Sequence, residues 1–216
     1  MKKLSVILTL LIGFFCLFAL STSAMADNVK AGDIITLNYG SAHSGNGGEF
    51  LITSSSYSFE TFCLETDEFF TPGKSYKVAG VTDSAQRGGS NTNLGDILDN
   101  KTAWLYYMFR TNQLDDYNND SASAGALQNA IWYIEEEITS ISGQALIWYN
   151  AADQAVTAYN WSNNGQVAVV NIVDTNYGVG TTNYYKQDQL TLVPEPTSLI
   201  LLGLGLLGIA VLRRKQ

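Results

Sequence analysis

The stretch Tyr57-Ser58-Phe59-Glu60-Thr61-Phe62-Cys63-Leu64-Glu65 indicates how the body of this chain is built. It begins by alternating aromatic and polar residues, a pattern typical of a β-strand with one buried face. A turn of three serines separates it from residues 49–53. The two segments are therefore expected to pair as a β-hairpin, with Cys63 near the end of the second strand.

Segments on both sides of this hairpin carry equally clear patterns. Alternating or β-branched segments predict strands at 33–39, 75–81, 166–173 and 189–193. Apolar residues at helical spacing predict helices at 94–111, 123–138 and 144–160, the second capped by Ser121 or Ser123. This order predicts an α+β domain in which a three-helix insert packs against a β-sandwich or barrel.

The N-terminus has the three parts of a secretory signal peptide. Lys2 and Lys3 precede an almost unbroken apolar run from residue 4 to residue 20, and Ala24-Met25-Ala26 supplies small residues for cleavage. We expect signal peptidase to remove residues 1–26 and to leave Asp27 as the first mature residue. A retained membrane anchor is the alternative.

The C-terminus also has three parts. Val193-Pro194-Glu195-Pro196 leads into an uncharged segment, 197–212, and then into Arg213-Arg214-Lys215. As a helix, the uncharged segment would span about 24 Å, a little less than a hydrocarbon core of about 30 Å. The basic end should stay cytoplasmic, so a membrane-spanning sorting helix would leave the rest of the chain outside.

This tail resembles the PEP-CTERM sorting signal of Gram-negative bacteria that produce exopolysaccharide. The resemblance implies recognition by exosortase, a membrane protease-transpeptidase, and a mature protein that ends near Pro194. The protein would first be anchored in the inner membrane and then reach the cell surface or the extracellular matrix. A plain single-span anchor is the alternative.

Three regions follow: a signal peptide at 1–26, an extracytoplasmic domain at 27–192 and a sorting signal at 193–216. The body up to residue 196 has seven basic residues against all twenty acidic residues of the chain, a formal charge of −13. A surface this acidic repels phosphate backbones, which excludes nucleic acid as a partner.

Cys63 remains as the only cysteine once Cys16 leaves with the signal peptide. Sixty-five positions later, Gln128 enters the second predicted helix within the segment Leu127-Gln128-Asn129-Ala130-Ile131-Trp132. A thiol and a carboxamide held together away from water can condense with loss of ammonia to an internal thioester, which is an activated acyl group. Amide groups at the helix start would stabilise the oxyanion, and Phe62, Trp132 and Tyr133 would exclude water.

The segments 62–65 and 127–132 are together similar to the motifs of thioester domains in bacterial surface adhesins. That resemblance implies a Cys63–Gln128 thioester, with Glu65 as the acidic residue of the first motif. The domain would attach once, covalently, to an amine or hydroxyl on a partner protein or polysaccharide. Such a protein is not a turnover enzyme and needs no cofactor.

Other interpretations stay open. Cys63 is a buried free thiol if the protein is a non-covalent structural or carbohydrate-binding component of a biofilm matrix, and an exposed Cys63 would permit an intermolecular disulfide. A calcium-stabilised carbohydrate-binding module is a third class, with weak candidate ligands in Asp115, Asp116 and Asp120; a solvated loop is favoured there. The only histidine, His43, is expected to be solvated.

Overall fold

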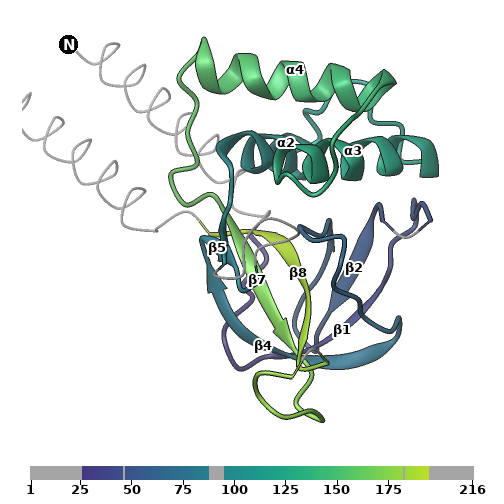
Figure 1. Cartoon of the computed structure of the whole chain (residues 1–216), viewed down its shortest axis with the longest axis vertical. Coiled ribbons are helices and arrows are strands. Elements are labelled where there is room, and N and C mark those ends of the chain that lie inside the picture. Colours follow the sequence, from purple (N-terminus) through teal and green to yellow (C-terminus); the bar gives the residue numbers. More distant parts are fainter. Residues whose placement is uncertain (1–25, 46, 88–94, 182, 195–216) are drawn as a thin grey trace, which may run out of the picture.

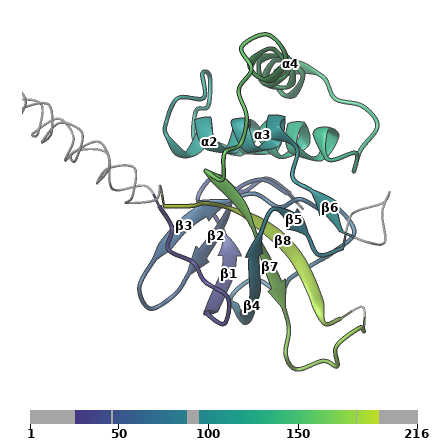
Figure 2. The same cartoon turned by 90° about the vertical axis from the view of Figure 1, so that its left-hand side faces the viewer.

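Six antiparallel strands form the main sheet of the domain, and three helices form a layer over one end of it (Figures 1 and 2). The computed structural model describes residues 26–45, 47–87, 95–181 and 183–194. In chain order, its elements are β1 (Ile34–Tyr39), β2 (Phe50–Thr53), β3 (Ser58–Thr61), β4 (Lys74–Thr82), β5 (Ser84–Ala85), β6 (Asp96–Ile97), α2 (Asn100–Arg110), α3 (Ser121–Ile134), α4 (Gly143–Thr157), β7 (Val167–Val173) and β8 (Tyr185–Leu192). The predicted α+β class with three helices is confirmed.

The strand order is β3-β2-β1-β4-β7-β8, and β5 and β6 form a separate two-stranded sheet. The main sheet is open, which corrects the prediction of a sandwich or barrel. Its edges still meet at one place, because the chain continues past β3 and residues 62–64 run beside β8. Leu190 N donates to Phe62 O at 3.1 Å, and Leu64 N donates to Asp188 O at 3.2 Å. Cys63 lies at this junction, opposite Gln189.

The predicted hairpin is present, since β2 and β3 pair antiparallel with Phe50 opposite Thr61. Helix α2 begins at residue 100 rather than 94, because Asp99 caps it by accepting from Lys101 N. Helix α3 is capped by Asp120 instead of Ser121 or Ser123. Asp120 and Ser123 form a capping box, in which each side chain accepts a hydrogen bond from the other residue's backbone N–H.

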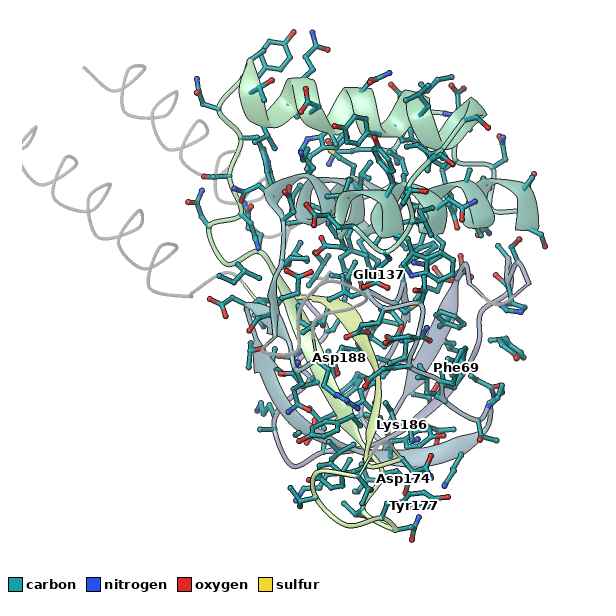
Figure 3. The ribbon with its side chains drawn as sticks, in the orientation of Figure 1. Phe69, Glu137, Asp174, Tyr177, Lys186 and Asp188 are labelled. Carbon is teal, nitrogen blue, oxygen red and sulfur yellow. The ribbon has the colours of Figure 1, made fainter. Side chains whose placement is uncertain are left out.

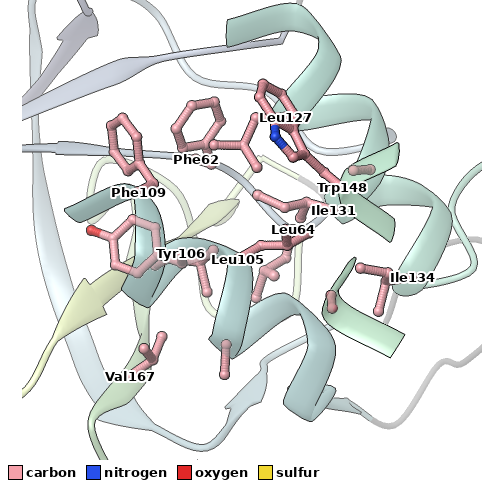
Figure 4. Close-up of a cluster of buried hydrophobic side chains, with 14 of the residues drawn as sticks. Phe62, Leu64, Leu105, Tyr106, Phe109, Leu127, Ile131, Ile134, Trp148 and Val167 are labelled. Atoms are coloured by element: carbon pink, nitrogen blue, oxygen red, sulfur yellow. The ribbon is translucent and has the colours of Figure 1, made fainter. Parts of the chain in front are cut away.

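Two apolar clusters meet at the segment after β3. The first lies between the helices and the sheet and includes Phe62, Leu64 and Leu127 (Figure 4). The second lies within the curled sheet and includes Cys63 and Phe50. Successive residues of an extended segment point to opposite sides. Cys63 therefore faces one cluster while its two neighbours face the other.

The first and last residues of the domain are hydrogen-bonded to each other. Asp27 N donates to Leu192 O at 3.1 Å, and Leu192 N donates to the Asp27 carboxylate at 2.8 Å. The predicted signal peptide and the predicted sorting helix lie outside the described residues. Within the described ranges, no helix is long and apolar enough to cross a membrane.

Candidate functional site

The side chains of Cys63 and Gln128 lie in contact, although 65 positions separate them. Cys63 Sγ lies 3.3 Å from Gln128 Oε1 and donates to it. Gln128 Nε2 donates to Cys63 O at 2.8 Å, and Cys63 N donates to Gln128 Oε1 at 3.3 Å. Both residues are buried, with exposed fractions of 0% and 1%. The carboxamide is thus held against the thiol by both of its polar ends.

The loop between β1 and β2 covers this pair. Gly48 N donates to Gln128 Oε1 at 3.4 Å, so the amide oxygen accepts from two backbone N–H groups besides the thiol. A β-carbon on Gly47 would lie 2.4 Å from Trp132 Cη2 and 2.7 Å from Gln128 Cγ. Only glycine fits here. The loop and the Trp132 indole therefore close over the carboxamide.

A buried carboxylate holds the covering loop in shape. Glu49 is fully buried and directly precedes β2. Its Oε1 accepts from Ser41 Oγ at 3.2 Å and from Ala42 N at 3.3 Å, while its Oε2 accepts from Tyr117 Oη at 3.1 Å. These bonds tie both ends of the loop to the segment that precedes α3. Gly47 and Gly48 therefore lie as a cover over the pair.

Burial raises the pKa of the Cys63 thiol well above its ordinary value, and the nearby Glu65 carboxyl adds to the rise. The Trp132 indole opposes this rise in pKa, although its Nε1 makes no hydrogen bond with the described residues. The thiol is therefore neutral near pH 7. A neutral thiol is a poor nucleophile toward molecules in solution.

Glu65 lies beside the pair in a group of buried carboxyls rather than at the carboxamide. Its Oε2 accepts from Asp188 N at 2.9 Å, and its Oε1 has no partner among the described residues. Burial and the charge of Asp188 raise the pKa of Glu65 well above its ordinary value. Burial also raises the pKa of Asp188 to about 7. Figure 3 shows Asp188 and Glu137 below the helical layer. The Glu137 carboxylate accepts a hydrogen bond from Thr66 Oγ1.

Two residues that were expected to shield the pair lie elsewhere. Phe62 is buried in the cluster under the helices, where its ring meets Phe109 edge-on with centroids 5.1 Å apart. Tyr133 packs edge-on against Tyr149 of α4. The expected role of the helix start is also wrong, because Gln128 lies in the middle of α3 and its oxygen accepts from Gly48 and Cys63 instead.

The weak calcium candidates do not form a site. Asp120 uses its carboxylate to cap α3, and Asp115 and Asp116 are exposed. The described ranges contain no group of three or more His, Cys, Asp or Glu side chains that could hold a metal ion. His43 is half-buried rather than solvated, and its ring stacks on Tyr39 with centroids 3.8 Å apart.

Comparison with known proteins identifies the tail. Residues 192–215 match the PEP-CTERM protein-sorting motif. The PEP-CTERM motif marks an exported protein that is anchored to the membrane before exosortase processes it and that then reaches the cell surface. Val193 and Pro194 of the motif lie at the end of the described residues; Glu195, Pro196, Arg213 and Arg214 lie outside them. No curated protein and no solved structure shows a significant match to the chain.

Proposed function

We propose that this PEP-CTERM protein forms an internal Cys63–Gln128 thioester and uses it once, to attach covalently to a nucleophile on a partner surface. The contact of 3.3 Å between the Cys63 sulfur and the Gln128 amide oxygen, with both side chains buried, carries the proposal. A carboxamide buried in an apolar core is unfavourable unless it is hydrogen-bonded, and the Gln128 carboxamide bonds to Cys63 and Gly48. Its orientation toward the one cysteine of the body suggests chemistry.

The condensation needs no reagent beyond the two side chains. Cys63 Sγ attacks Gln128 Cδ, the sulfur–carbon bond forms, and the bond from Cδ to Nε2 breaks. The thiol proton leaves with the nitrogen as ammonia. Negative charge develops on Oε1 during the attack, and the N–H groups of Cys63 and Gly48 already point to that oxygen.

In the capture step, the leaving group is the Cys63 thiol instead of ammonia. An amine or hydroxyl on a partner protein or polysaccharide attacks Cδ, and the thiol of Cys63 leaves with the nucleophile's proton. Gln128 is then joined to the partner through an amide or an ester. The Trp132–Gly47 cover supports this scheme, because it keeps water from hydrolysing the thioester before a partner arrives.

A non-covalent structural or carbohydrate-binding role in a matrix is the second candidate. It is favoured by the complete burial of Cys63 and by the raised pKa of its thiol, which suit an inert core residue. In this case, the Gln128 carboxamide serves only to hold the segment after β3 against α3.

An intact mass of the exported protein separates the two candidates. We expect the wild type to be lighter than its sequence by one ammonia, and we expect Cys63→Ala and Gln128→Ala to have their full masses. Added methylamine should increase the wild-type mass and expose one titratable thiol. A full wild-type mass, with one thiol that titrates only after unfolding, would contradict the thioester.

A further inference from the structure

A cavity of about 610 Å³ opens where the chain leaves α4 and turns toward β7. Its walls include three aromatic side chains, Trp104, Tyr159 and Trp161, and four carboxamides, Gln154, Asn160, Asn164 and Gln166. In Figure 1 this turn lies on the opposite side of the helical layer from β1 and β2, whose connecting loop covers the Cys63–Gln128 pair. The cavity is therefore separate from the site already described.

The two tryptophans are held in place by the core. Both are half-buried and pack against the cluster under the helices. Trp161 also lies 6.4 Å from the Tyr107 ring, centroid to centroid, and its backbone N–H donates to Ala155 O at 3.0 Å. Rigid aromatic faces of this kind bind flat apolar surfaces at little cost in conformational entropy. Tyr159 is 73% exposed and leaves room for a ligand beside it.

The polar groups of the cavity are neutral and partly unused. Gln166 Oε1 is buried and has no hydrogen-bond partner among the described residues, although its backbone is fixed by a bond from Val193 N at 2.9 Å. The Gln166 carboxamide lines the cavity and therefore has an acceptor that the described residues leave unused. None of the residues that line the cavity is charged.

From these features we infer that the cavity binds a neutral saccharide. Pyranose rings offer apolar C–H faces that stack on indole and phenol rings, and their hydroxyls both donate to and accept from carboxamides. The absence of lining charge favours a neutral ligand over an acidic one. The formal charge of −13 on the body adds to this preference, because it repels anionic polymers.

This inference does not depend on the thioester. The cavity beside the turn after α4 would bind saccharide whether Cys63 is acylated or free, and retardation of Cys63→Ala, which cannot capture a polysaccharide covalently, would report on the cavity alone. The two proposals can therefore fail separately.

Gel electrophoresis in the presence of polysaccharides tests the inference. The exported protein would be run through gels that contain dextran, galactomannan or hydroxyethyl cellulose as neutral polymers, or alginate as an acidic one. We expect at least one neutral polymer, and not alginate, to retard the wild type. Tyr159→Ala and Trp161→Ala should weaken the interaction about tenfold or more, as expected for aromatic anchors.

Tyr177→Ala is the matched control. Tyr177 is 44% exposed in the β7–β8 loop, which Figure 3 shows at the opposite end of the domain from α4, and its loss should leave retardation unchanged. Because Tyr159 is mostly exposed, its variant keeps the test valid even if Trp161→Ala fails to fold. Retardation by none of the neutral polymers, or by alginate alone, overturns the inference. Equal retardation of Tyr159→Ala and the wild type also overturns it.

Discussion

Gly47 is the residue that most limits the space around the Cys63–Gln128 pair. An added β-carbon would meet the Trp132 ring at 2.4 Å and the Gln128 stem at 2.7 Å. Gly47→Ala should therefore displace the covering loop and lower the free energy of unfolding by about 1–3 kcal/mol, as overpacking does. Urea unfolding measures this loss. The mass of the exported variant should also show less of the ammonia-deficient form, because the N–H of Gly48 moves with the loop.

Gly178→Ala is the control for this substitution. A β-carbon there would meet only Thr181 Cγ2, at 3.9 Å, so we expect a change within about 0.5 kcal/mol, as at ordinary surface positions. If both variants unfold at the same urea concentration as the wild type, the loop is not packed as described.

The Glu65 carboxyl makes the free energy of unfolding of the domain depend on pH. Its pKa is raised in the folded state by burial and by Asp188, so between pH 4.5 and neutrality the unfolded chain binds fewer protons than the folded one. Stability then falls as pH rises, with a ceiling of about 1.4 kcal/mol per pH unit for one carboxyl. The raised pKa of Asp188, about 7, acts in the same direction.

Glu65→Gln should make this fall shallower. The glutamine oxygen can still accept from Asp188 N, and the added NH₂ can occupy the position of Oε1, which has no partner among the described residues. Thermal unfolding at pH 5 and pH 8 compares the variant with the wild type and with Asp115→Asn, which removes an exposed charge. A wild type that is equally stable at both pH values would rule out the raised pKa.

At the scale of elements, α3 carries both Gln128 and Trp132, so its first turn matters to the site. Asp120 accepts from Ser123 N at 2.8 Å, and Asp120 N donates to Ser123 Oγ at 3.2 Å. Asp120→Ala should cost about 1 kcal/mol, which for a domain of this size lowers Tm by about 2–4 °C. Asp120→Asn retains a capping oxygen and should lose much less. Scanning calorimetry measures Tm for both variants. A loss of Tm in Asp120→Ala alone indicates that the capping hydrogen bond matters, and an equal loss in both indicates that the charge does.

The elements that sequence could predict are those with a local signal. Alternation located the β2–β3 hairpin, and apolar spacing located α2, α3 and α4. Strand β8 begins at residue 185 rather than 189, because Gln187 and Asp188 are buried polar residues that bond to Glu65, more than 100 positions away. In the sequence alone, these polar residues are typical of a loop rather than of a buried strand.

The candidate site was predictable to a similar degree. The motifs around Cys63 and Gln128 indicated that the two residues form a pair. The cover could not be predicted, because Gly47-Gly48 resembles any flexible loop until Trp132 is placed against it. Phe62 was misplaced because residues 62–64 alternate between two clusters, which no local pattern distinguishes from a strand with one buried face.

At the scale of the whole molecule, the two ends that are expected to be processed lie side by side. Asp27, the residue after the predicted signal-peptidase site, is 5% exposed. Its carboxylate accepts from Arg110 at 2.7 and 2.9 Å, from Thr191 Oγ1 at 3.0 Å and from Leu192 N at 2.8 Å. Leu192 is also the first residue of the PEP-CTERM match. Asp27 thus fastens the strand that leads into the sorting motif.

Arg110→Met tests this fastening. It leaves the buried Asp27 carboxylate without its cation, and loss of one partner from a buried ion pair typically costs about 3–5 kcal/mol. Hydrogen exchange at the Leu192 amide should accelerate with the global loss of stability. Adding Asp27→Asn to Arg110→Met removes the unpaired charge and should recover part of the loss. Lys101→Met, which breaks pairs with the exposed carboxylates of Asp99 and Asp153, should cost less than about 1 kcal/mol. Equal costs for Arg110→Met and Lys101→Met would mean that Asp27 does not fasten β8.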